Sequence, residues 1–184
     1  GTTMNIRLVK ATSRGIAALL VASGLTITPA LAIEDNLHFS GTLTSAPCGL
    51  DPLTTDLSVD FDMIMEPDLY AYARTKGVPF TITLTDCDLS IASKASITFK
   101  GTESTELPGL LAVTGEAAGI AIGVETEDGI AVPFNKPTPE HVLNSGDNTF
   151  TLMAYIQGEP THLRQETITP GNFTAVSTFM LAYP

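Results

Sequence analysis

The chain has 184 residues, of which 43% are hydrophobic, and its 20 acidic residues outnumber nine basic ones. All acidic residues follow Ala32, whereas three basic residues precede it, so residues 33–184 combine 20 acidic with six basic residues and carry a formal charge of −14. Such a negative surface argues against nucleic acid or an anionic membrane as a partner. The length after residue 32 is enough for one domain with a sizeable core.

Residues 1–32 have the order that is typical of a secretory signal. Three basic residues precede an apolar run from 16 to 27, and small residues at Ala30 and Ala32 permit cleavage after Ala32. The alternative is a membrane anchor, but about twelve apolar residues are too few to cross a hydrocarbon core of ~30 Å. We therefore expect an upstream extension and a cleaved signal peptide in this range, and no membrane insertion of the chain after cleavage.

Residues 33–45 contain a short alternating pattern. Leu37, Phe39, Gly41 and Leu43 share one face of a strand, and polar residues point the other way. Burying the three larger side chains of this face would contribute roughly 1.5–3 kcal/mol each before the cost of ordering them. On the residues alone, an ordinary first strand of the chain's own sheet is the simpler interpretation, and a strand given to another molecule is the alternative.

The chain has two cysteines, Cys48 and Cys87, and both follow the predicted signal. An even pair of cysteines in an exported protein is most simply a disulfide. A metal site would need further soft ligands nearby, but the three histidines are far apart in the sequence and no Cys-x-x-Cys motif occurs. We therefore expect neither a metal nor a cofactor.

Period-two patterns recur along the chain, separated by turns that contain Gly, Pro, Asn and Asp. The predicted strands lie at residues 57–63, 80–84, 95–99, 120–124 and 150–156. One short helix is expected at residues 67–74, where Leu69, Tyr70 and Ala73 could share a face. The many short strands predict an all-β fold of one domain, an antiparallel sandwich, with a β-barrel as the alternative.

The last fourteen residues form one uninterrupted alternating pattern after the turn at Gly171. One face of the predicted strand consists of Phe173, Ala175, Ser177, Phe179, Leu181 and Tyr183. Because this strand ends at Pro184, no downstream segment can pair with it. The pattern therefore indicates a strand whose neighbour comes from outside the chain.

Several motifs occur in a fixed order along the chain. They are the alternating segment 37–43 before Pro47-Cys48, then Pro79-Phe80, Thr85-Asp86-Cys87, residues 97–101, residues 119–122, the Asp128-Gly129 turn, Gly171 and Tyr183. In this order they resemble the pilin subunits of the chaperone–usher pathway in Gram-negative bacteria, over essentially all of the chain after residue 32. Residues 97–115 are most similar to the minor tip-fibrillum or adaptor subunits of P-type pili.

The resemblance implies an incomplete immunoglobulin-like β-sandwich that lacks its last strand and is completed in trans by donor-strand exchange. Residues 33–45 would be an N-terminal donor-strand extension and residues 46–184 the pilin domain, with a disulfide between Cys48 and Cys87. The donor side chains would be Asp35, Leu37, Phe39, Gly41 and Leu43. The acceptor groove and chaperone-binding strand would comprise Gly171, Phe173, Ala175, Ser177, Phe179, Leu181, Tyr183 and Pro184.

The same resemblance implies a structural subunit of an extracellular adhesive fimbria that reaches the cell surface through the periplasm. Its partners would be a periplasmic pilus chaperone, an outer-membrane usher and neighbouring pilin subunits. A receptor-binding tip adhesin is the alternative, but adhesins of this pathway carry a lectin domain before the pilin domain, and the residues before Leu37 leave no room for one. We do not expect an enzyme, because the sequence contains no nucleophile elbow, phosphate loop or zinc-binding helix motif.

Overall fold

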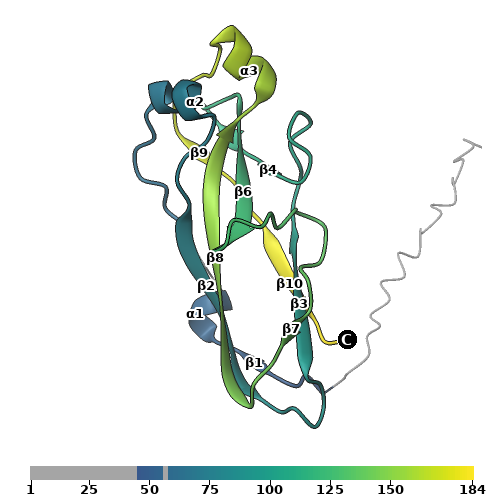
Figure 1. Cartoon of the computed structure of the whole chain (residues 1–184). Helices are drawn as coiled ribbons and strands as arrows, with labels where there is room; N and C mark the ends of the chain where they lie inside the picture. The colour runs from purple at the N-terminus through teal and green to yellow at the C-terminus, as the bar shows by residue number, and fades with distance from the viewer. Residues whose placement is uncertain (1–44, 56–57) are drawn as a thin grey trace, which may run out of the picture. The chain divides into compact units, whose positions relative to one another are not determined.

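A computed structural model describes residues 45–55 and 58–184 (Figure 1). The predicted signal at residues 1–32 and the predicted donor side chains, Asp35, Leu37, Phe39, Gly41 and Leu43, lie outside the described residues. No helix in the described ranges is long and apolar enough to span a membrane.

The described strands are all paired in antiparallel fashion. One sheet has the order β1-β2-β8-β6-β4. Its strands are β1 (Gly49–Leu50), β2 (Val78–Cys87), β8 (Gly146–Gly158), β6 (Ile120–Thr126) and β4 (Leu111–Ala112). A second sheet has the order β10-β3-β7, with β10 (Thr178–Ala182), β3 (Lys94–Lys100) and β7 (His141–Val142). A separate pair joins β5 (Thr114–Gly115) to β9 (Phe173–Thr174).

The two larger sheets bury a shared apolar core. In β2 the side chains of Phe80, Ile82 and Leu84 are buried, as the period-two pattern predicts for one face of a strand. Phe99 of β3 meets Phe80 edge to face, with the ring centroids 6.1 Å apart, so the aromatic contact joins the two sheets. The sandwich that the alternation predicts is therefore confirmed, and four of the predicted strands lie within β2, β3, β6 and β8.

Within residues 45–55 and 58–184, three short helices connect the strands: α1 (Pro52–Thr55), α2 (Glu66–Tyr72) and α3 (Pro160–Gln165). The predicted helix at 67–74 is present as α2, which ends where Ala73 adopts a left-handed conformation with φ 64°. Leu69 of α2 is buried in a second apolar cluster with Ile120, Ile156 and Ile168. This cluster fixes α2 against β6 and β8.

Two expectations about strands are wrong. Residues 58–65 form no strand: Asp62 has a φ of 54°, and its amide donates a hydrogen bond to Oδ1 of Asp60 (2.8 Å), so the alternation is interrupted there. The final segment is not one strand but two, because residues 175–177 separate β9 from β10. At this break Ser177 donates its hydroxyl to the carbonyl of Lys100 (2.9 Å).

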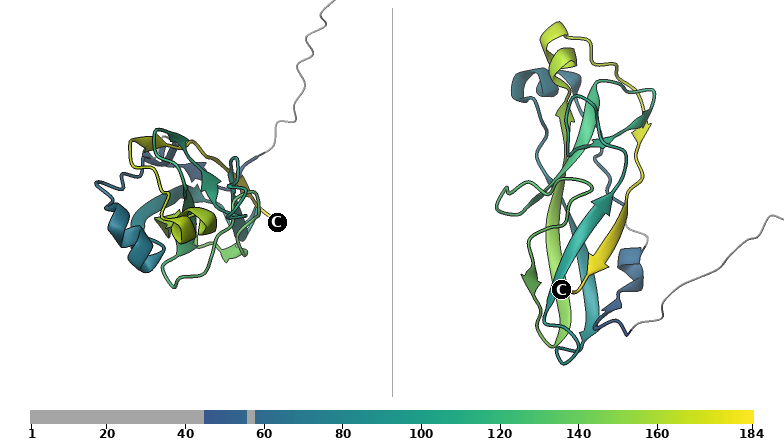
Figure 2. Two further views of the ribbon diagram at one scale, coloured as in Figure 1. Left: turned by 90° about the horizontal axis from the view of Figure 1, so that it is seen from above. Right: turned by 90° about the vertical axis from the view of Figure 1, so that its right-hand side faces the viewer.

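The described domain has two opposite ends (Figures 1 and 2). At one end, β1 and the last residues of β2 lie beside Pro47, whose carbonyl accepts a hydrogen bond from the amide of Asp88 (2.7 Å). β10 finishes toward the same end, because Ala182 pairs with Ser96 near the start of β3. We call this the root end, and we call the opposite end, which carries α2, α3 and β9, the helix end.

Candidate functional site

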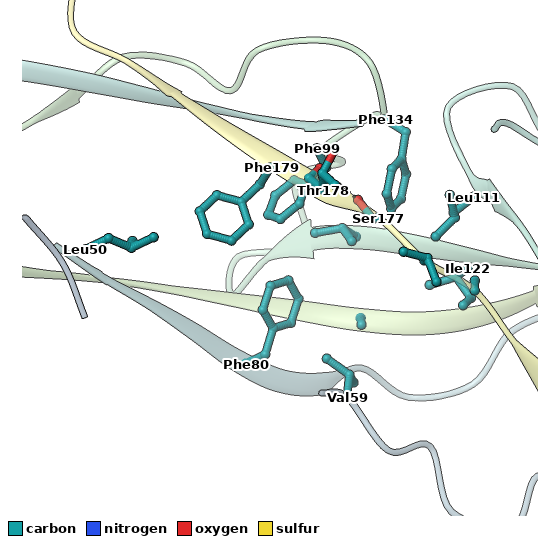
Figure 3. Close-up of a pocket in the computed structure, with 14 residues that line it drawn as sticks. Leu50, Val59, Phe80, Phe99, Leu111, Ile122, Phe134, Ser177, Thr178 and Phe179 are labelled. Atoms are coloured by element: carbon teal, nitrogen blue, oxygen red, sulfur yellow. Dashed lines mark hydrogen bonds between the residues drawn. The ribbon is translucent and has the colours of Figure 1, made fainter. Parts of the chain in front are cut away.

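An apolar groove opens between the last strands and the irregular segment 58–64. The part beside β10 has a volume of about 580 Å³ and is shown in Figure 3; we call it the β10 part. The floor is formed by side chains of both sheets and of the loop after β6; among them are Phe80, Phe99, Leu111, Ile122 and Phe134. Val59 lines one side, and residues 175–179 line the other. Except for the half-buried Ile122, these floor side chains are at most 9% exposed, and the partly exposed apolar lining includes Leu50, Val59, Ile122 and Phe179.

The groove continues toward the helix end. Val59, Ile122 and Ala175 line both the β10 part and this continuation. The continuation is bounded by residues 58–64 and 171–175 and has a volume of about 630 Å³. Phe61 and Phe173 come from opposite sides, and their ring centroids are 6.3 Å apart. This aromatic pair brings the two sides of the groove close together within the continuation.

β10 forms one rim and has a free edge. Within the part of the chain that the structure describes, β10 pairs with β3 alone, and it is the outermost strand of its sheet. An edge strand beside an apolar groove is the arrangement to which an added β-strand binds, through main-chain hydrogen bonds and alternate side chains. The geometry is therefore suited to accepting a strand.

The alternation predicted for the final segment is confirmed in its exposure pattern. Five side chains of the predicted inner face are half-buried, whereas Ser177 is exposed at the break between the two strands. The five are Phe173, Ala175, Phe179, Leu181 and Tyr183. Burial also raises the pKa of the Tyr183 hydroxyl.

The remaining predicted residues lie at the ends of the final segment and at the root. Gly171 lines the mouth of the groove with a φ of 145°, a conformation that L-residues rarely adopt. Pro184 is exposed at the root end. Cys48 and Cys87 form the predicted disulfide, with their Cα atoms 4.1 Å apart, and so fix β1 to the end of β2.

Sequence reasoning missed the other side of the groove. Val59 and Phe61 were expected in an ordinary strand, and only the structure places them opposite residues 171–179. Their period-two spacing indicates a strand, but it does not reveal that a neighbouring strand is absent between this segment and β10. The sequence does not distinguish the floor residues Ile122 and Phe134 from other core residues. A core position beneath a missing strand has the same sequence pattern as any other core position. Among the described residues, no group of three or more His, Cys, Asp or Glu could hold a metal ion.

The fold and groove together define a class of protein. An antiparallel sandwich with a free edge strand beside an apolar groove is an incomplete immunoglobulin-like domain that lacks one strand. The family model described as "Fimbrial protein" matches residues 37–184, so the chain belongs to the fimbrial protein family.

Relatives of known type support this assignment. The chain is 33% identical to the Fimbria A protein of Serratia marcescens over 145 residues, which cover 79% of this chain and 82% of that protein. It is 32% identical to the fimbrial adapter PapK of Escherichia coli over 160 residues, which cover 83% and 89% of the two chains. The crystal structure of the P pilus rod subunit PapA is similar with a TM-score of 0.67 and 25% identity, over 76% of this chain and all of that one.

The predicted resemblance to pilins is therefore confirmed. The chain is a structural subunit of an extracellular fimbria, in which it associates with other subunits.

Proposed function

We propose that the groove accepts a β-strand from a neighbouring subunit, and that residues 33–45 of each subunit are the strand it donates. One observation carries this proposal: an apolar groove with half-buried side chains such as Val59, Ile122 and Phe179 lies beside the free edge of β10. The donor segment alternates with a period of two, so Leu37, Phe39 and Leu43 can enter the groove while its backbone pairs with β10. Residues 46–184 then form the acceptor domain, and residues 1–32 are removed before assembly.

The length of the connecting chain supports a donor from another subunit. Every described strand pair is antiparallel, so we expect the donor to run antiparallel to β10, which places Leu43 near Phe173 at the helix end. Three residues connect Leu43 to Pro47, and the four residue steps span at most ~14 Å. Pro47 lies at the root end, and the eight residue steps from Phe173 to Leu181 span roughly 26 Å. A subunit's own Leu43 is therefore too far away to fill this position.

The shape of the groove supports one register. With Leu43 opposite Phe173, Phe39 lies opposite Ser177, beside the β10 part of the groove, where Phe80, Phe99 and Phe134 line the floor. Gly41 then lies opposite Ala175, close to the point where Phe61 and Phe173 approach each other across the groove. The residue without a side chain thus lies next to the position where the two sides come close together.

We infer that a periplasmic chaperone occupies the same groove during export and that an outer-membrane usher exchanges it for the donor strand. An unfilled groove would expose apolar side chains, and an exposed edge strand favours aggregation, so an exported subunit needs a temporary partner there. Pro184 is exposed at the root end, so basic residues of such a chaperone can reach this part of the final segment. This role is structural and assigns no catalytic residue.

The test is the substitution Gly41→Asn. An asparagine at this position would overfill the groove where its two sides come close together, at a cost of about 1–3 kcal/mol, and would bury an amide without partners. In a strand-exchange assay with purified chaperone complexes, we expect the variant to fail as a donor to a wild-type neighbour. It should still accept a synthetic peptide of residues 33–45, because its own groove is unchanged.

Ser40→Asn is the matched control. Ser40 lies on the opposite face of the donor strand, which points away from the groove, so this variant should donate at the wild-type rate. Equal donation by Gly41→Asn and Ser40→Asn would contradict the proposed register. Failure of the wild-type protein to donate would contradict the exchange mechanism itself.

A further inference from the structure

Exposed apolar side chains lie at both ends of the domain. At the helix end, the side chains of Met63 and Met65 precede α2, and the two residues are 85% and 54% exposed. At the root end, Leu89 and Ile91 lie in the turn between β2 and β3 and are 40% and 50% exposed. Neither pair contributes to the cores of the described domain.

The turn that carries Leu89 and Ile91 is fixed to the point from which the donor segment leaves the domain. The amide of Asp88 donates to the carbonyl of Pro47 (2.7 Å), and the amide of Ile91 donates to the carbonyl of Asp88 (3.1 Å). The Asp88 carboxylate also accepts hydrogen bonds from the amide (2.9 Å) and the hydroxyl (2.6 Å) of Ser90. This network holds the turn that carries the two apolar residues next to Pro47.

Met63 lies where the groove opens at the helix end. It lines the mouth of the groove together with Gly171 and Phe173. Met65 follows two residues later, at the start of α2. An arriving donor strand would therefore leave the groove beside these methionines.

The short connection between the donor strand and its domain brings the two pairs together. If Leu43 of one subunit lies opposite Phe173 of the next, Pro47 of the donor is within ~14 Å of that mouth, because only three residues intervene. The turn 88–93 is hydrogen-bonded to Pro47 and must lie at the same place. We propose that Leu89 and Ile91 of the donor pack against Met63 and Met65 of the acceptor, a second copy of this chain or a close relative. This inference rests on the proposed strand exchange.

The charges near both pairs favour an apolar contact over an ionic one. Asp60 and Asp62 flank the groove on the acceptor side, and Asp86 and Asp88 flank the turn on the donor side. Like charges on both surfaces provide no attraction, so buried apolar area has to supply it. Because the two surfaces lie at opposite ends of one subunit, the contact is head-to-tail and repeats along a fibre without closing.

A cross-link between two purified subunits tests the contact. The acceptor carries Met63→Cys and is held in its chaperone complex, and the donor carries Ile91→Cys. After strand exchange under mild oxidation, we expect a covalent dimer that survives boiling and is visible on a non-reducing denaturing gel. A donor with Ile130→Cys is the matched control, because Ile130 is also an exposed isoleucine (60%) but lies in the turn after β6, and it should give no dimer.

Two further donor variants distinguish this inference from the strand exchange on which it rests. Ile91→Ser without added cysteines should exchange normally, but the exchanged dimer should dissociate about three- to tenfold faster, because apolar contact area is lost. A donor that combines Gly41→Asn with Ile91→Cys should form no covalent dimer. Normal exchange without a Met63–Ile91 link, or an equally strong link with the Gly41→Asn donor, would overturn the contact. Absence of exchange by wild-type subunits would instead contradict the proposed function.

Discussion

Tyr155 of β8 lies directly across from Gly123 of β6, and its ring occupies the space that a side chain at position 123 would need. The guanidinium carbon of Arg74 lies 3.6 Å from the centroid of the same ring. Arg74 also donates two hydrogen bonds to Glu125, from Nη1 to Oε2 (3.0 Å) and from Nη2 to Oε1 (2.7 Å). The arginine therefore fixes the segment after α2 to the sheet by stacking and by a bidentate ion pair.

This arrangement predicts different costs for two substitutions. Gly123→Ala places a methyl group against the buried ring of Tyr155 and should lower the free energy of unfolding by about 1–3 kcal/mol. Arg74→Lys removes the planar contact and one of the two hydrogen bonds, but this site is partly exposed, so we expect a loss of only about 1 kcal/mol. Chemical denaturation of the peptide-filled subunit measures both values. A larger loss for Arg74→Lys than for Gly123→Ala would contradict this account.

For individual residues, the sequence predicted which side chains face inward better than it predicted which side chains they contact. The inward residues of β10, Phe179 and Leu181, follow from period two alone, and so does the buried face of β2. The stack of Arg74 on Tyr155 could not be predicted, because it depends on where the segment after α2 crosses the sheet. Cys48 and Cys87 were the exception, since an exported chain with two cysteines allows one intramolecular pair.

The segment 58–65 shows why one predicted strand is absent. Its residues alternate in the sequence, but the strand that would lie between this segment and β10 is missing from the described domain. A strand needs a partner for its backbone amides and carbonyls, and without one the segment forms a local turn at Asp60–Asp62. Under the proposed strand exchange, the sequence pattern corresponds to the completed domain, whereas the described domain lacks the added strand.

We therefore predict that filling the groove converts residues 59–63 into a paired strand. When a synthetic peptide of residues 33–45 displaces the chaperone, the amides of this segment should exchange with solvent at least about tenfold more slowly, because the peptide's backbone lies within hydrogen-bonding distance. Hydrogen exchange measured by mass spectrometry would show the difference between subunits filled by the peptide and subunits still held by the chaperone. The amides shared by β2 and β8 provide the control, since their partners are already present and their exchange should not change.

The same prediction has a matched peptide control. A peptide with Gly41→Asn should protect residues 59–63 much less, because the substitution prevents seating near Phe61 and Phe173. If the wild-type peptide slows the amide exchange of β10 but not that of residues 59–63, the donor pairs with only one rim of the groove. The segment 58–65 would then be a loop in the assembled fibre as well.

For the whole molecule, the excess of acidic residues opposes association between copies. Residues 33–184 contain 20 acidic and six basic residues, so every subunit that approaches another is strongly negative. The donor segment adds to this repulsion, because Glu34 and Asp35 precede its apolar residues while Asp60 and Asp62 flank the groove that receives it. Burial of apolar side chains must outweigh a long-range repulsion that salt can screen.

Strand exchange should accordingly become faster as salt is added. Raising the ionic strength from 0.01 M to 0.15 M shortens the Debye length from about 30 Å to about 8 Å, which removes most of the repulsion between approaching charges. We expect the association rate of a peptide of residues 33–45 with a chaperone-held acceptor to increase several-fold over this range. A peptide with Glu34→Gln and Asp35→Asn should associate faster at low salt and respond less to added salt, and comparing the two peptides cancels any effect of salt on the chaperone. Equal salt responses of both peptides would show that the charges of the donor segment do not control the encounter.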